Sequence, residues 1–171
     1  MATVTFKNDT VCNLAGTEIN VGDTAPVVTV VNCNPMLQDE QIGGSDKVQM
    51  VVVVPSLDTP VCDAETRRFN TEASSIDGVE VITVSMDLPF AAAKFCSTAG
   101  IDNLKVCSDF RNKDFSNAYG MLLADGPLAG VTARCIFVIG KDGKVAYKQL
   151  VPEITAEPDY AEAIAAAKAA A

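Results

Sequence analysis

The sequence predicts an α/β fold, in which a mixed central sheet is flanked by helices and is preceded by an N-terminal β-hairpin. Lys47 to Val54 is apolar and β-branched almost throughout, which is typical of a strand buried on both faces of a parallel or mixed sheet. Downstream, strand and helix patterns alternate, which implies right-handed crossovers. Residues 3 to 22 alternate apolar and polar around Asn8-Asp9 and Ala15-Gly16, which indicates the hairpin.

The first elements after the hairpin are expected as follows. Val27 to Val31 predicts a short strand, and the polar stretch Asn34 to Asp46, with Gly43-Gly44, predicts a loop before the buried strand. Thr59 is then expected to cap a helix with Pro60 at its first position, which puts Cys62 at the third. Helical spacing gives this helix one shared face, made of Cys62, Thr66, Phe69, Ala73 and Ile76.

The rest of the chain continues the alternation of strands and helices. The expected strands are Val79 to Ser85, Leu104 to Cys107, Thr132 to Ile139 and Lys144 to Leu150, the last two joined by a turn at Asp142-Gly143. The expected helices are Phe90 to Ala99 with Gly100 as its end, Asn112 to Tyr119, and an alanine-rich helix from Pro158-Asp159 with Tyr160 and Ile164 on its buried face.

Length and composition fit one domain over residues 1–171, with the hairpin as an extension over about 1–22, because 49% of the 171 residues are hydrophobic. Lys and Arg total 13 against 22 Asp and Glu, a formal charge of -9 that repels nucleic acid and anionic membrane surfaces. Histidine is absent, which excludes Ser-His-Asp and Cys-His catalysis and removes the commonest ligand of catalytic zinc. We therefore expect no cofactor, no metal, no nucleic acid and no membrane partner.

The N-terminal residues show no basic segment followed by an apolar one, and no run elsewhere approaches the length of a membrane span. A cytoplasmic protein is therefore expected. The six cysteines include no C-x-x-C pair, so neither a zinc ribbon nor a dithiol redox motif is indicated. Reduced thiols are the usual state of cysteines in that compartment.

Cys62 follows the buried strand and begins a helical pattern, so its thiol lies in a strand-to-helix turn. The free N–H groups and the positive dipole end of a helix favour a thiolate, and Pro55 and Pro60 stiffen the turn. The alternative is an inert core cysteine, since Cys62 shares its predicted face with Phe69 and Ala73.

Cys96 lies on the next predicted helix, on an apolar face with Ala92 and Ala99, and a core role is the alternative there too. The remaining cysteines carry no local signal, and packing is the favoured interpretation for each: Cys12, Cys33, Cys107 and Cys135.

The stretch Pro55-Ser-Leu-Asp-Thr-Pro-Val-Cys62 contains the pattern P-x-x-x-T-x-x-C and resembles the peroxidatic site of peroxiredoxins. Further stretches resemble the bacterial thiol peroxidases, an atypical 2-Cys subfamily: Met86-Asp-Leu-Pro-Phe-Ala91, Lys94-Phe-Cys96, Ala118-Tyr-Gly-Met, Ala124-Asp-Gly-Pro-Leu128 and Ile154-Thr-Ala-Glu-Pro-Asp-Tyr160. The resemblance covers nearly the whole chain in order, and it implies a thioredoxin-like fold.

Carried over residue by residue, the resemblance implies that Cys62 is the peroxidatic nucleophile and Cys96 the resolving cysteine, with Pro55, Thr59 and Arg134 around the peroxide. By itself Arg134 predicts a surface cation, and the motif match reverses that preference. The implied cycle forms a Cys62 sulfenic acid and then an intramolecular Cys62–Cys96 disulfide, which thioredoxin reduces. The resemblance also implies antioxidant defence, a homodimer, and hydrogen peroxide or alkyl and lipid hydroperoxides as substrates, with a preference for the bulkier ones.

Other interpretations remain open from the sequence. Cys107 and Cys135 are alternative disulfide partners, and Cys135 adjoins Arg134. A thioredoxin-like disulfide reductase or isomerase fits the fold, but such enzymes need two close thiols. In a redox sensor, Cys62 oxidises and passes the signal to another protein, and catalytic turnover with a thioredoxin system separates the two functions.

Overall fold

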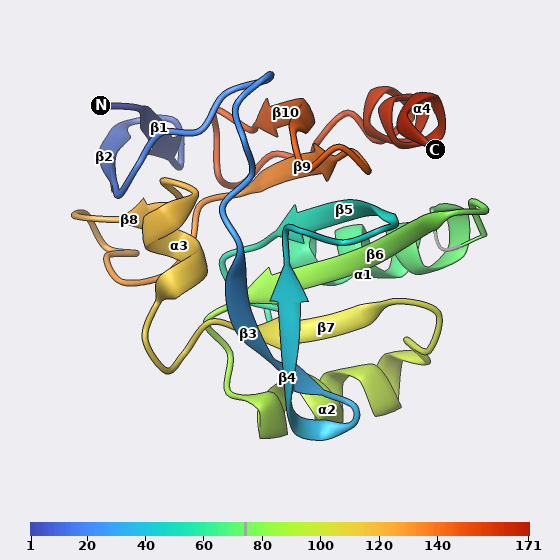
Figure 1. The fold of residues 1–171 in the computed structure, drawn as a ribbon. Helices are drawn as coiled ribbons and strands as arrows, with labels where there is room; N and C mark the ends of the chain where they lie inside the picture. The colour runs from blue at the N-terminus through green and yellow to red at the C-terminus, as the bar shows by residue number, and fades with distance from the viewer. Residues whose placement is uncertain (74) are drawn as a thin grey trace.

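A computed structural model describes residues 1–73 and 75–171, and its centre is a 7-stranded mixed sheet of order β10-β9-β5-β6-β7-β3-β4 (Figure 1). The strands are β3 (Val28–Cys33), β4 (Met36–Ile42), β5 (Val48–Val53), β6 (Val79–Ser85), β7 (Lys105–Ser108), β9 (Cys135–Ile139) and β10 (Val145–Leu150). β5, β6 and β7 are parallel neighbours, and the remaining pairs of this sheet are antiparallel. The predicted mixed sheet is confirmed.

Strand β5 divides the core because its side chains alternate between two layers. Met50 and Val52 belong to one buried cluster, which contains residues of helices α1 (Pro60–Glu72), α2 (Pro89–Ala99) and α4 (Tyr160–Ala170). Val51 and Val53 belong to the other, with helix α3 (Asp114–Ala118) and the N-terminal hairpin. Both faces of the sheet are therefore covered, which explains why β5 has no polar alternation (Figure 1).

The N-terminal hairpin consists of β1 (Thr3–Phe6) and β2 (Thr10–Ala15), paired antiparallel, and β2 also pairs with β8 (Leu122–Leu123) in a separate sheet. The predicted hairpin is confirmed, but its second strand ends before Gly16 rather than at residue 22. Gly16 has φ 94°, and a Cβ there would lie 2.4 Å from the Asn117 carbonyl oxygen. The chain must turn where that close approach occurs.

The polar stretch Asn34 to Asp46 was predicted to be a loop, and this prediction is wrong over most of its length. Residues 36–42 form β4, which pairs with β3 at the edge of the sheet. Most of its side chains are exposed, so the strand has no apolar face that its sequence could display. The predicted loop is real on either side of β4, at residues 34–35 and 43–46, and Gly43 and Gly44 both have positive φ.

The predicted face of α1 is correct for Cys62, Thr66 and Phe69, which are buried. The helix ends at Glu72, so Ile76 does not lie on it. The Ile76 amide instead donates a hydrogen bond to the Ala73 carbonyl at 3.2 Å, in a turn that leads through Gly78, with φ 77°, into β6. A left-handed glycine favours that turn over a further helical turn.

The other predicted elements are present with small shifts at their ends. Gly100 ends α2 in the left-handed conformation with φ 70°, as predicted. β9 begins at Cys135 rather than Thr132, because the Thr132 hydroxyl donates to the Val54 carbonyl at 2.7 Å and the Ala133 amide to Met121. Within the described residues, no helix has the length and apolar character that crossing a membrane requires.

Candidate active site

The turn between β5 and α1 places Cys62 in the first turn of the helix. Thr59 occupies the N-cap position with extended backbone angles, Pro60 follows it, and Cys62 is fully buried. The predicted side-chain cap is wrong, because the Thr59 hydroxyl donates to the Ser56 carbonyl at 3.0 Å and makes no capping hydrogen bond. That bond holds the turn closed and leaves the helix N-terminus to act on the thiol.

Asp87 anchors this turn to the end of β6. Its carboxylate accepts hydrogen bonds from the Ser56 hydroxyl, the Leu57 amide and the Ser85 hydroxyl, each at 2.7 Å. Hydrogen bonds to a charged acceptor are stronger than neutral ones. Asp87 lies in one of the stretches that carried the family resemblance, but no local pattern there predicts these hydrogen bonds to the Cys62 turn.

Arg134 lies just before β9, is 2% exposed, and reaches the Cys62 sulfur. Its Nη1 donates to Cys62 Sγ at 3.3 Å and to Glu65 Oε2 at 2.6 Å. Its Nε and Nη2 donate to the Ile154 carbonyl oxygen at 3.1 and 2.9 Å. The guanidinium is therefore held in one orientation, buried beside Cys62 rather than exposed as a surface cation.

The charge of Arg134 is maintained despite its burial. Desolvation lowers the pKa of Arg134, but the opposing effects of Cys62 and Glu65 outweigh it, so the pKa is raised overall. A guanidinium that stays charged in a buried site favours an anion on the neighbouring sulfur. It also offers hydrogen-bond donors to an anion that develops nearby.

Glu65 is a member of this site that the sequence interpretation missed. Its side chain is fully buried, and in the described part of the chain its Oε1 has no hydrogen-bond partner. Desolvation raises the pKa of Glu65 to about 7, although the charge and the hydrogen bond of Arg134 oppose the shift. The available signal was a carboxylate three residues after Cys62, close to the helix face that was predicted to be buried.

An apolar cavity of about 410 Å³ adjoins the turn. The residues expected around a peroxide, Pro55, Thr59 and Arg134, all line it, together with Leu128 and Val131. Among the described residues, Cys62 is not part of the lining, so Arg134 is the link between the cavity and the sulfur. The structure thus brings together four of the five predicted site residues.

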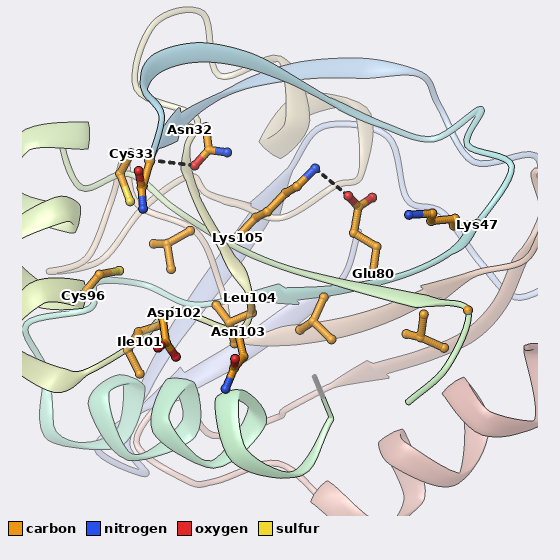
Figure 2. Close-up of a pocket in the computed structure, with 15 residues that line it drawn as sticks. Asn32, Cys33, Lys47, Glu80, Cys96, Ile101, Asp102, Asn103, Leu104 and Lys105 are labelled. Atoms are coloured by element: carbon orange, nitrogen blue, oxygen red, sulfur yellow. Dashed lines mark hydrogen bonds and ion pairs between the residues drawn. The ribbon is translucent and has the colours of Figure 1, made fainter. Parts of the chain in front are cut away.

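Cys96, the fifth predicted residue, lies elsewhere. It is partly buried in the last turn of α2 and packs against the same core layer as Cys33 at the end of β3. The neighbouring Cys96 thiol, above all, lowers the pKa of Cys33, and the Cys33 thiol raises that of Cys96. Both cysteines line a pocket of about 380 Å³, and Figure 2 shows them at the same end of it.

All six cysteines are free thiols. The alternative partners named from sequence, Cys107 and Cys135, are fully buried, and burial raises the pKa of Cys135 to about 12 and also raises the pKa of Cys107. Both belong to the core cluster on the α3 side of the sheet, whereas Cys96 packs against the α1 side. The thiol beside Cys96 is therefore Cys33, which sequence reasoning had assigned to packing.

Comparisons with known proteins agree with this geometry. Residues 20–164 match the Redoxin family. A thiol peroxidase of Aquifex aeolicus is 50% identical over 163 residues, which cover 95% of this chain and 94% of that protein. A thiol peroxidase of Campylobacter jejuni is 51% identical over 162 residues, which cover 95% of this chain and 90% of that protein.

Solved structures show the same relationship. The crystal structure of a peroxiredoxin-like protein from Aquifex aeolicus superimposes with a TM-score of 0.95 at 48% identity, over 100% of this chain and 98% of that one. Thiol peroxidase from Chromobacterium violaceum has a TM-score of 0.83 at 21% identity, over 94% and 91% of the two chains, and supports the fold alone. The chain therefore belongs to the Redoxin family, among the thiol peroxidases, and is a peroxidase oxidoreductase with the thioredoxin-like fold of the peroxiredoxins.

Proposed function

We propose that this peroxidase reduces hydroperoxides with Cys62 as the attacking thiolate and so serves antioxidant defence. The observation that carries the proposal is the position of Arg134, whose Nη1 lies 3.3 Å from Cys62 Sγ while the same side chain lines the apolar cavity. One guanidinium can therefore act on both the sulfur and a bound peroxide. The names of the relatives support the same chemistry.

In the first step, the Cys62 thiolate attacks one peroxide oxygen and the O–O bond breaks. The other oxygen takes a proton and leaves as water or an alcohol, and Cys62 becomes a sulfenic acid. Negative charge develops on the leaving oxygen, and preoriented donors stabilise such charge most effectively in a site with little water. Arg134 supplies these donors, and Thr59 and Pro55 shape the wall against which the peroxide lies.

In the second step, the Cys96 thiol condenses with the Cys62 sulfenic acid, so that a disulfide forms and water leaves. Cys62 is fully buried and Cys96 lies beside Cys33, so α2 has to leave its present position for the two sulfurs to meet. Thioredoxin then reduces the disulfide. A cytoplasmic location and a homodimeric state complete the proposal.

The cavity bears on the choice of peroxide. Apolar side chains make up most of its wall, and about 410 Å³ exceeds what hydrogen peroxide alone would fill. This favours alkyl or lipid hydroperoxides as the preferred substrates, with hydrogen peroxide also accepted.

The proposal is tested by steady-state peroxide consumption with thioredoxin and its reductase. Wild type should turn over, Cys62→Ser should not, and Cys96→Ser should stop after one turnover because its sulfenic acid is not resolved. Turnover by Cys62→Ser at the wild-type rate would exclude Cys62 as the nucleophile. Disulfides between Cys62 and a cysteine other than Cys96, mapped by peptide mass after the first turnover, would exclude the resolving assignment.

A further inference from the structure

Cys33 and Cys96 form a pair of thiols that the peroxidase reaction, as proposed above, does not use as a pair. Cys33 ends β3, where the pairing with β4 is irregular, and its side chain belongs to the core layer beneath α2. Cys96 packs against the same layer from α2, and the two cysteines line the same pocket and the same groove. The helix therefore already holds its cysteine against a second one.

We propose that Cys33 and Cys96 form a second redox-active disulfide, to which the Cys62–Cys96 disulfide passes its oxidising equivalents by thiol–disulfide exchange. The inference rests on the proposed function, because it needs Cys96 to have first joined Cys62. It goes beyond that function because the reductant would then reduce the Cys33–Cys96 disulfide rather than the Cys62–Cys96 disulfide.

The step is a nucleophilic substitution at sulfur that conserves electrons. The Cys33 thiolate attacks Cys96 Sγ, a new S–S bond forms, the Cys62–Cys96 bond breaks, and Cys62 leaves as a thiolate. No oxidant or reductant is consumed. Arg134 stabilises the departing Cys62 anion, since its Nη1 already donates to that sulfur.

The packing of α2 gives the exchange its direction. A Cys62–Cys96 bond holds Cys96 away from its place beside Cys33, at a cost in helix packing. Exchange lets α2 return to the position it has here, with Cys96 bonded to the neighbouring Cys33.

Access favours the same outcome. Cys62 is fully buried, whereas Cys96 is partly exposed, and both Cys33 and Cys96 line a groove of about 520 Å³ as well as the pocket in Figure 2. A disulfide must be reached in line by an attacking thiol to be reduced. A Cys33–Cys96 disulfide would present its sulfurs to such a groove, and the released Cys62 would be ready for another peroxide.

Peroxide stoichiometry without any reductant tests the inference. The reduced protein is titrated with peroxide, quenched with acid and a maleimide, and its disulfides are mapped by peptide mass. Wild type should consume about two equivalents, because the exchange frees Cys62 to react again, whereas Cys33→Ala should consume about one. The second equivalent should appear as a Cys62 sulfenic acid that dimedone labels.

Cys107→Ala is the matched control. Cys107 lies on β7, paired with Asn32 next to Cys33, but its side chain belongs to the core layer on the other face of the sheet. This variant should keep the two-equivalent stoichiometry. Wild type that consumes one equivalent and holds only a Cys62–Cys96 disulfide would overturn the inference while leaving the proposed function intact.

A second measurement separates the pair from the peroxidase. Cys62→Ala should lose the rapid consumption of peroxide. Oxidised glutathione should still produce an intramolecular Cys33–Cys96 disulfide in this variant. Failure to form that disulfide, or formation of mixed disulfides alone, would overturn the inference. Rapid peroxide consumption by Cys62→Ala would instead overturn the proposed function, and the inference with it.

Discussion

The two thiol sites of this protein lie at opposite ends of their helices. Cys62 is in the first turn of α1, fully buried and hydrogen-bonded to Arg134, whereas Cys96 is in the last turn of α2, partly exposed and beside Cys33. A helix N-terminus favours an anion and a helix C-terminus opposes one. This contrast fits the proposed roles, in which Cys62 attacks as a thiolate and Cys96 reacts afterwards as a thiol.

The surroundings of the two sites differ in the same sense. Around Cys62, Arg134 and Asp87 fix the geometry through several charge-assisted hydrogen bonds. Around Cys96, a groove and a pocket leave room for movement and for access. In the proposed reaction, the attack on peroxide develops charge beside Cys62 and needs fixed hydrogen-bond donors. The later disulfide steps need Cys96 to move and to be accessible.

The largest effect on the Cys62 site is expected from the removal of Arg134. Arg134→Ala should lower the rate of Cys62 with peroxide by about 100-fold or more, the typical effect of removing an electrostatic donor. The rate with iodoacetamide, measured at a pH that ionises the thiol in both proteins, should fall far less, because that reaction develops no charge on oxygen. Stopped-flow measurement of both rates checks this.

Removal of Arg134 also leaves Glu65 buried without its partner, so folding has to be controlled for. Arg134→Lys keeps a cation but not the fork that holds the Ile154 carbonyl, and it should lie between wild type and Arg134→Ala in peroxide rate. Equal losses of the peroxide and iodoacetamide rates in a folded variant would mean that Arg134 acts on the sulfur alone.

Glu65 makes the stability of the Cys62 site depend on pH. Its pKa is about 7 in the folded protein and near 4.3 when unfolded, so the folded state binds the proton more tightly. Its contribution to stability is therefore fully present below about pH 4 and is lost as the pH rises to about 7, a change on the order of 2–4 kcal/mol. Glu65→Gln should remove this part of the pH dependence.

Urea unfolding of wild type and Glu65→Gln between about pH 5 and 8 measures that difference. The glutamine keeps a hydrogen-bond acceptor for Arg134, so the peroxide rate should stay within about threefold of wild type. Parallel stability curves for the two proteins across this range would contradict the raised pKa of Glu65.

Thr59 should give the smallest effect. Thr59→Val loses the hydrogen bond to the Ser56 carbonyl, worth about 0.5–1.5 kcal/mol, and should slow the peroxide reaction by up to about tenfold. Thr59→Ser retains the hydroxyl and should behave like wild type. A loss in Thr59→Ser as large as that in Thr59→Val would contradict the assignment of the effect to this hydrogen bond.

The sequence allowed the buried strand, the turn at Cys62 and the helix that Gly100 ends to be predicted, because each has a local cause. β4 could not be recognised, because an edge strand exposed on most of its length needs no apolar alternation. Glu65 and Cys33 were not predicted as site residues for a different reason. Their partners are remote in sequence, 69 positions away in the case of Glu65 and Arg134, so only the folded chain brings them together.

A single-turnover reaction with one equivalent of peroxide is the most direct test of the separate roles proposed for Cys62 and Cys96. The loss of peroxide is followed in wild type, Cys62→Ala and Cys96→Ala without any reductant. We expect Cys96→Ala to consume the peroxide as fast as wild type and to retain a sulfenic acid, and Cys62→Ala to leave the peroxide intact. Slow consumption by a folded Cys96→Ala, or consumption by Cys62→Ala at the wild-type rate, would contradict it.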